Sequence, residues 1–163
     1  PGWMGHADRF AFEPDYRPAP GISRFLTGTQ SVIAMAAVQA ALSIFDSVTV
    51  NTLRQHSLML TQNLMDQLAK NPATCGIECL TPSDAHARGS QVSLRLEHGF
   101  AISQALIDRG VIVDFREPDI IRFGIAPLYN QSGDIDVAVS TLADILNSGV
   151  YREQKFSKRA TVT

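Results

Sequence analysis

One arginine lies within an otherwise apolar, strand-like stretch, and its surroundings suit an anionic ligand. In residues 119–130, Asp-Ile-Ile-Arg-Phe-Gly-Ile-Ala-Pro-Leu-Tyr-Asn, the apolar side chains at 121, 123 and 125 fall on one face at a period of two. Arg122 therefore points to the other face, beside Gly124, whose missing side chain leaves space for a bound group. A guanidinium has a planar fork of donors that holds both oxygens of a carboxylate. The alternative interpretation is an edge-strand arginine whose head group lies in water.

A second candidate site precedes an apolar helix in the N-terminal part of the chain. Thr27-Gly28-Thr29-Gln30 offers a hydroxyl and free backbone N–H groups at the positive end of the helix dipole, which together suit a phosphate. The simpler interpretation is an ordinary threonine N-cap. Trp3, the sole tryptophan, either packs on the core or donates its indole N–H to an acceptor such as a phosphate oxygen.

Other kinds of chemistry lack the residues that they need. The four histidines are scattered without a carboxylate or thiol partner at ligand spacing, so the sequence predicts no metal site. The two cysteines, Cys75 and Cys79, match neither a zinc spacing nor a redox motif. Because no nucleophile elbow or phosphate-binding glycine-rich loop occurs either, the chain is not expected to catalyse a reaction by itself.

The composition indicates a folded protein without affinity for polyanions. Hydrophobic residues make up 45% of the 163 residues, which is enough for a substantial core. The 14 basic and 16 acidic residues give a net charge of −2, which leaves no basic excess for nucleic acid. The most apolar run, 32–45, is shorter than the roughly 20 residues of a membrane span. No secretory signal is found, and reduced thiols are expected, so we predict a cytoplasmic protein without membrane contact.

The elements that must position these residues differ between the two parts of the chain. Residues 1–30 are rich in proline, glycine and aromatic residues without periodicity, which predicts a long ordered loop that lines something. The run 30–45 is apolar almost all round and predicts a helix covered on most sides. A second helix is expected over 52–70, ended by Asn71-Pro72.

The remaining sequence alternates strand and helix patterns. Strands are expected at 76–80, 91–96 and 111–115 and at Arg122, with a polar loop over 81–90. Helices are expected over 99–109, with Gly110 as a left-handed cap, and after Ser132 as N-cap, whereas the tail beyond Gly149 reads as polar and basic. The pattern predicts an α+β fold, a layer of four strands covered by helices on one face, with no internal repeat.

Several ordered motifs resemble kynureninase in its C-terminal part. They are Gly2-Trp3-Met4-Gly5-His6, Phe10-Ala11-Phe12, Tyr16-Arg17-Pro18-Ala19-Pro20-Gly21-Ile22, Arg24-Phe25-Leu26-Thr27-Gly28-Thr29-Gln30, Ile121-Arg122-Phe123-Gly124-Ile125-Ala126-Pro127-Leu128-Tyr129, and the tail residues Tyr151-Arg152-Glu153 and Ala160-Thr161-Val162-Thr163. These segments follow one another through most of the chain, which makes their combination much more specific than any one of them.

The resemblance implies part of a pyridoxal-phosphate (PLP)-dependent enzyme of fold type I. It implies a cytosolic homodimer that hydrolyses L-kynurenine, or its 3-hydroxy form, to anthranilate, or 3-hydroxyanthranilate, and L-alanine, in tryptophan degradation and NAD biosynthesis. Residues 1–46 would be a strip of the large PLP-binding domain, comprising a loop and a buried helix, and 47–163 the small C-terminal domain. The chain begins without Met or a regular element, and it is expected to be a fragment that is inactive alone because the Schiff-base lysine lies upstream in the family.

The resemblance also implies roles for four residues. Trp3 and Thr29 match positions that contact the cofactor phosphate, and Arg122 matches the arginine that holds the substrate α-carboxylate. Met4 matches a position near the substrate ring. No catalytic residue is assigned to this chain. Two other function classes remain open from the residues alone, namely a regulatory module that binds an amino acid through Arg122 and a structural dimerisation domain.

Overall fold

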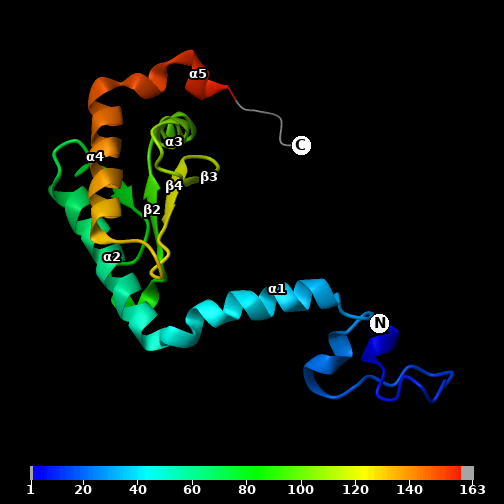
Figure 1. The fold of residues 1–163 in the computed structure, drawn as a ribbon. Helices are drawn as coiled ribbons and strands as arrows, with labels where there is room; N and C mark the ends of the chain where they lie inside the picture. Colours follow the sequence, from blue (N-terminus) through cyan, green and yellow to red (C-terminus); the bar gives the residue numbers. More distant parts are fainter. Residues whose placement is uncertain (1, 159–163) are drawn as a thin grey trace. The chain divides into compact units, whose positions relative to one another are not determined.

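The computed structural model describes residues 2–158 and divides into two compact units, Pro1–Val48 and Thr49–Thr163. Figure 1 shows the helices and strands of which the two units are made. That these units are parts of a large and a small domain stays a prediction.

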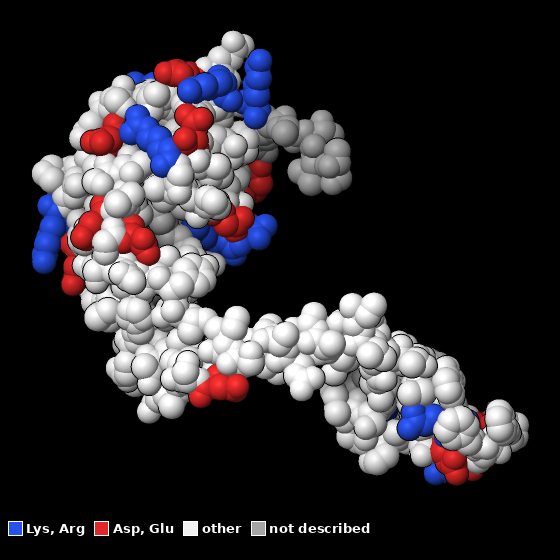
Figure 2. Space-filling model, in the orientation of Figure 1, with Lys and Arg blue, Asp and Glu red and all other residues white. Residues whose placement is uncertain are grey.

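The first unit consists of an aromatic loop and one apolar helix. The loop contains two 3-10 helices, η1 (Trp3–Gly5) and η2 (Gly21–Phe25). The helix α1 (Val32–Leu42) follows and continues into η3 (Ser43–Ser47). The sequence predicts a covered helix, but none of the residues of α1 is buried in this chain. Figure 2 shows α1 as a surface without charged side chains.

The second unit is an antiparallel sheet with helices against it, and its elements are those that the hydrophobic pattern predicts. The strands are β1 (Glu78–Cys79), β2 (Gln91–Arg95), β3 (Asp114–Arg116) and β4 (Ile120–Gly124), in the order β1-β2-β4-β3. The helices are α2 (Val50–Lys70), α3 (Gly99–Asp108), α4 (Ser132–Ser148) and α5 (Gln154–Ser157), with short turns η4 (Ala85–Ala87) and η5 (Val150–Arg152). The predicted α+β class is confirmed.

One face of the sheet forms the core, and the other carries polar side chains. Val92 and Leu94 of β2 and Ile121 and Phe123 of β4 are buried. They join a single cluster with apolar side chains of α2, α3 and α4, as expected when alternate strand residues meet a helical layer. Arg122, between two buried neighbours, therefore lies on the opposite face.

Three details differ from the sequence prediction. Helix α4 has Gln131 rather than Ser132 as its N-cap, because Gln131 and Asp134 form a capping box. The strand β3 begins at Asp114 rather than at 111. The tail is not wholly polar, since Tyr151 and Phe156 are buried against the core; its last residues, 159–163, lie outside the described part.

Within the described residues, no single helix is long and apolar enough to cross a membrane. One bent pair of helices in the described part of the chain, Val32–Ser47 with Val50–Lys70, has the length and composition for a span when taken together. The second of these helices contributes Leu60, Leu64 and Leu68 to the core of its own unit.

Candidate functional site

The tryptophan motif at the N-terminus packs against the segment that leads to α1. A Cβ atom added at Gly2 would lie 2.0 Å from the carbonyl oxygen of Thr27, and one added at Gly5 would lie 2.4 Å from that of Arg24. Only glycine allows such close backbone contact. Gly2 therefore brings the tryptophan motif against Thr27, and Gly5 brings it against Arg24.

Thr29 is exposed and does not cap the helix. The N-cap of α1 is Ser31, whose side chain accepts a hydrogen bond from the Ala34 N–H at 3.3 Å. The interpretation of this segment as an ordinary threonine N-cap is therefore wrong. The hydroxyl of Thr29 takes no part in capping and lies three residues before Val32, the first residue of α1, where the helix dipole favours an anion.

Trp3 and Met4 are accessible from the solvent side of the loop. Trp3 is 54% exposed and meets Phe10 edge to face, with ring centroids 6.1 Å apart. The Met4 sulfur accepts a contact from Nη1 of Arg9 at 3.0 Å. Because Trp3 is not packed on the core, its indole remains accessible to a ligand. The substrate-ring role of Met4 stays a prediction.

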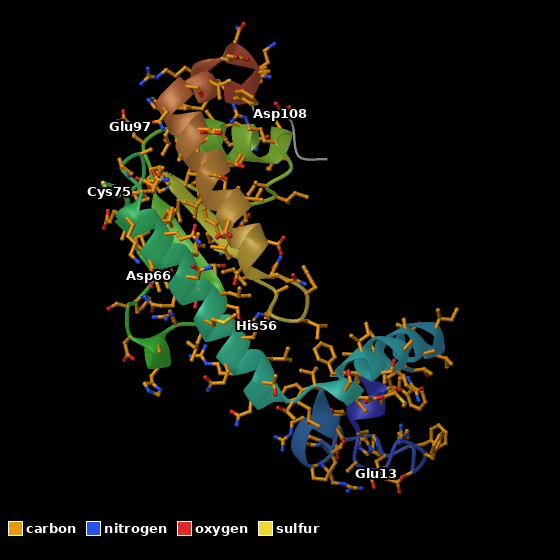
Figure 3. All side chains as sticks on the ribbon, turned by 60° about the vertical axis from the view of Figure 1, so that its left-hand side comes forward. Glu13, His56, Asp66, Cys75, Glu97 and Asp108 are labelled. Atoms are coloured by element: carbon orange, nitrogen blue, oxygen red, sulfur yellow. The ribbon has the colours of Figure 1, made fainter. Side chains whose placement is uncertain are left out.

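A hollow of about 320 Å³ adjoins Trp3 and is lined by His6, Arg9, Glu13 and Tyr16 among others. Arg17 donates two hydrogen bonds to Glu13, at 2.9 and 3.3 Å, which hold the pKa of that carboxyl below its ordinary value. The same pair raises the pKa of Arg17. Figure 3 shows Glu13 on the aromatic loop. The carboxylate therefore stays ionised and bound within the loop.

Arg122 lies in the interior of the sheet, which rules out the edge-strand interpretation. Strand β4 pairs with β2 on one side and β3 on the other, and Arg122 stands directly opposite Ser93 and Asp114. The Arg122 side chain is 29% exposed. Its Nε donates to Oδ2 of Asp114 at 2.6 Å, and its Nη2 donates to the same oxygen.

The open face around Arg122 is hollowed and rich in guanidinium groups. A hollow of about 450 Å³ is lined by Arg88, Arg116 and Arg122 together with Ser93 and residues of the 80–89 loop. A Cβ atom at Gly124 would have no heavy atom within 4 Å, so space beside Arg122 exists as predicted. An anion is the ligand that this cationic surface favours.

Arg88, which sequence reasoning missed, fixes the wall of this hollow. It is 7% exposed, and its Nη2 donates to Oε1 of Gln62 at 2.7 Å, while its other nitrogens contact Thr61, Pro82 and Ser83. With its donors used inside the protein, Arg88 holds the 80–89 loop against α2. No sequence pattern marks it, because the polar loop around it resembles any solvated turn.

Helix α2 also holds the segment that follows β4. Nδ1 of His56 lies 2.7 Å from the carbonyl oxygen of Pro127 (Figure 3). A carbonyl accepts hydrogen bonds only, so Nδ1 carries the proton. The neighbouring Ser57 bonds to Ser90 at 2.7 Å. Adjacent residues of α2 thus anchor the segment after β4, the strand that carries Arg122, and the segment before β2, its neighbour in the sheet.

Among the described residues, no cluster of His, Cys, Asp and Glu is arranged to hold a metal ion. The two cysteines are exposed thiols.

The matching family model and the curated relatives of this chain name the same family. Residues 53–142 match the family model described as the kynureninase C-terminal domain. Kynureninases of Burkholderia mallei (strain SAVP1) and Pseudomonas fluorescens are 43% and 41% identical over 162 residues, which are 99% of this chain and 39% of each relative. The chain thus spans about two fifths of the length of the relatives that it matches.

The fold is shared with a solved structure of more distant sequence. A C-DES mutant with glycine covalently linked to its PLP cofactor superposes with a TM-score of 0.69 at 24% identity, over 88% of this chain and 37% of that one. This likeness establishes that the chain shares the fold of the matching part of that PLP-bound protein, as the resemblance to kynureninase implies.

Proposed function

Because this chain belongs to the family of kynureninase C-terminal domains, we propose that it forms the substrate-clamping and phosphate-binding part of a kynureninase. The proposed reaction is the hydrolysis of L-kynurenine, or its 3-hydroxy form, to anthranilate, or 3-hydroxyanthranilate, and L-alanine. The proposed cofactor is pyridoxal phosphate, and the proposed assembly is a cytoplasmic homodimer. The observation that carries the proposal is Arg122, a guanidinium on an interior strand beside an open, cationic hollow.

The residues of the first unit fit the phosphate of the cofactor. Gly2 packs on the backbone of Thr27, which brings the accessible Trp3 close to the segment that carries Thr29. An indole N–H, a hydroxyl and the N-terminus of α1 are donors of the kind that hold a phosphate. Trp3 and Thr29 would therefore bind it. Pyridoxal phosphate, when bound, supplies an electron sink for the bonds at the substrate α-carbon.

Arg122 would orient the substrate through its α-carboxylate. The guanidinium stays charged at any working pH, and its fork can donate hydrogen bonds to both oxygens of a carboxylate. Fixing the carboxylate limits rotation at the α-carbon and so determines which of its bonds is presented for reaction. Arg122 therefore contributes binding and orientation and transfers no proton.

The lysines of this chain are poor candidates for a Schiff base. Lys70 ends α2 and is exposed, and the Lys155 ammonium lies 3.6 Å from both Asp108 and Glu153. Lys158 lies in the tail. We infer that the reactive lysine is supplied by another part of the enzyme.

The test is Arg122→Lys in an intact kynureninase that carries residues 1–163 as its C-terminal part, called here the intact enzyme. The lysine ammonium is a point charge and cannot form the two parallel hydrogen bonds of the arginine guanidinium. The KM for L-kynurenine should therefore rise about 10- to 100-fold, the loss expected for charge-assisted hydrogen bonds. The cofactor absorbance should be retained. Unchanged kinetics would refute the clamp.

Arg95→Lys is the matched control. Arg95 lies on the same face of the sheet, pairs with Glu78 at 2.8 Å and does not line the hollow. Its substitution should leave the KM within about twofold, as expected for an exposed ion pair.

A further inference from the structure

The strand register places Asp114 directly opposite Arg122, where the two side chains are in contact. The two residues are direct cross-strand partners on β3 and β4. Direct partners in an antiparallel pair point to the same face at short range, so the carboxylate reaches the guanidinium without a change of backbone. Arg122 is thus held at the centre of the sheet before any ligand arrives.

The contact occupies one edge of the guanidinium. Nε and Nη2 of Arg122 both donate to Oδ2 of Asp114. A guanidinium has five N–H donors in one plane, and the Nε and Nη2 donors to Asp114 lie along one edge of that plane. The edge formed by Nη1 and the second hydrogen of Nη2 is directed away from Asp114 and suits the two oxygens of a ligand carboxylate.

Arg116 offsets the charge of Asp114. Its Nε lies 3.2 Å from the same Oδ2 atom, and Arg116 lines the same hollow. One carboxylate between two guanidiniums leaves a net positive charge at this place, so a second carboxylate is still attracted.

We infer that Asp114 is a positioning residue that holds Arg122 in the orientation in which its free edge grips the α-carboxylate of an amino-acid substrate. This inference rests on the function proposed above. An unpaired arginine would have to lose side-chain rotamer freedom on binding, and the ion pair with Asp114 removes much of that freedom beforehand.

The experiment uses the intact enzyme with bound cofactor and measures two quantities. The first is the dissociation constant for L-alanine, the amino-acid product, from the change in cofactor absorbance; this readout needs no turnover. The second is the separate effect on KM and kcat for L-kynurenine. Asp114→Ala should raise the dissociation constant and the KM roughly 2- to 5-fold, the strength of a partly exposed ion pair, with kcat nearly unchanged.

Asp114→Asn provides the conservative variant. Asparagine keeps an acceptor oxygen for Arg122 and loses the charge, so it should restore most of the affinity that alanine loses. Asp108→Ala is the control, since Asp108, the last residue of α3 (Figure 3), pairs with Lys155 of α5. It should leave both quantities unchanged.

Three outcomes would overturn the inference. Tighter binding in both Asp114 variants would show that Asp114 competes with the ligand. Unchanged affinity in Asp114→Ala would show that it has no part in binding. An equal loss of kcat and cofactor absorbance would show a merely structural role. If Arg122→Lys leaves the dissociation constant unchanged, the proposed function itself is wrong. If Arg122→Lys raises it and Asp114→Ala leaves it unchanged, Arg122 binds the carboxylate and Asp114 does not position Arg122.

Discussion

Arg122 shows how the environment of one residue decides between two interpretations of the same sequence. Alternation of apolar residues places its side chain on the polar face of β4, but only strand order distinguishes an edge from an interior position. The sheet puts β4 between β2 and β3 and leaves Arg122 29% exposed. An arginine there meets ligands from one side only, which favours a specific contact over free solvation.

The partner of Arg122 could not have been predicted from the sequence. Asp114 and Arg122 are eight residues apart, and their pairing depends on the register of a strand only three residues long. Period-two reasoning assigns a face to each residue but not its cross-strand neighbour. The arginine itself was predictable because a charge inside an apolar alternation is rare.

Thr29→Ala should weaken cofactor retention by the intact enzyme. Loss of one hydroxyl donor to a phosphate oxygen costs on the order of tenfold in affinity. The measurement is the cofactor absorbance that remains after dialysis against buffer. Thr27→Ala is the control, because Thr27 is also exposed but meets Gly2 through its backbone. Equal retention by wild type and Thr29→Ala would remove Thr29 from the site.

Among the elements, the long helices are predictable from their strong periodicity, and the short structured segment at the C-terminal end is not. Helices α2, α3 and α4 follow from their apolar stripes, and Gly110 has the expected positive φ of 84°. The buried aromatics of the tail, Tyr151 and Phe156, were missed because polar residues separate them. Burial there comes from tertiary contact with α3, which local composition does not encode.

The N-terminus of α4 makes the stability of the second unit sensitive to acid. The Gln131 N–H and the Asn130 amide donate to the Asp134 carboxylate at 2.9 and 3.2 Å, and these bonds lower its pKa, the backbone bond most. A lowered pKa in the folded state means that the carboxylate stabilises the fold above its ordinary pKa of about 4. This contribution is lost as the pH falls below that value and through the lowered pKa.

Asp134→Asn should therefore reduce the acid sensitivity of the chain. Urea unfolding is monitored by circular dichroism at pH 7 and at acid pH. Between these two conditions, the urea midpoint of the variant should fall less than that of wild type. Asp144→Asn, on the exposed face of the same helix, is the control and should match wild type. A wild-type-like pH dependence of Asp134→Asn would contradict the capping role.

At the scale of the whole molecule, the two units differ in how much of their apolar surface they cover themselves. The second unit has a closed core that includes the fully buried Leu60, Ile121 and Leu142. In the first unit, Val32 and Ile33 of α1 are 79% and 85% exposed. Its all-round apolar pattern correctly predicts a helix, but burial depends on contacts that a sequence pattern cannot supply.

The chain by itself should not turn over L-kynurenine. Its lysines are exposed or ion-paired, whereas a Schiff-base lysine must adjoin the cofactor. We expect no anthranilate fluorescence when residues 1–163 are incubated with pyridoxal phosphate and L-kynurenine. Activity should appear only with the remainder of a kynureninase supplied. Release of anthranilate by the chain alone would refute the proposal that another part of the enzyme supplies the reactive lysine.

The central claim is that Arg122 binds the α-carboxylate of the substrate, and ligand truncation tests it most directly. The dissociation constants of L-kynurenine and of the corresponding amine without the carboxylate would be measured for the intact enzyme and for Arg122→Lys. The account predicts that the variant binds L-kynurenine about 10- to 100-fold more weakly and binds the amine as well as wild type does. An equal loss for both ligands, or no loss for either, would contradict it.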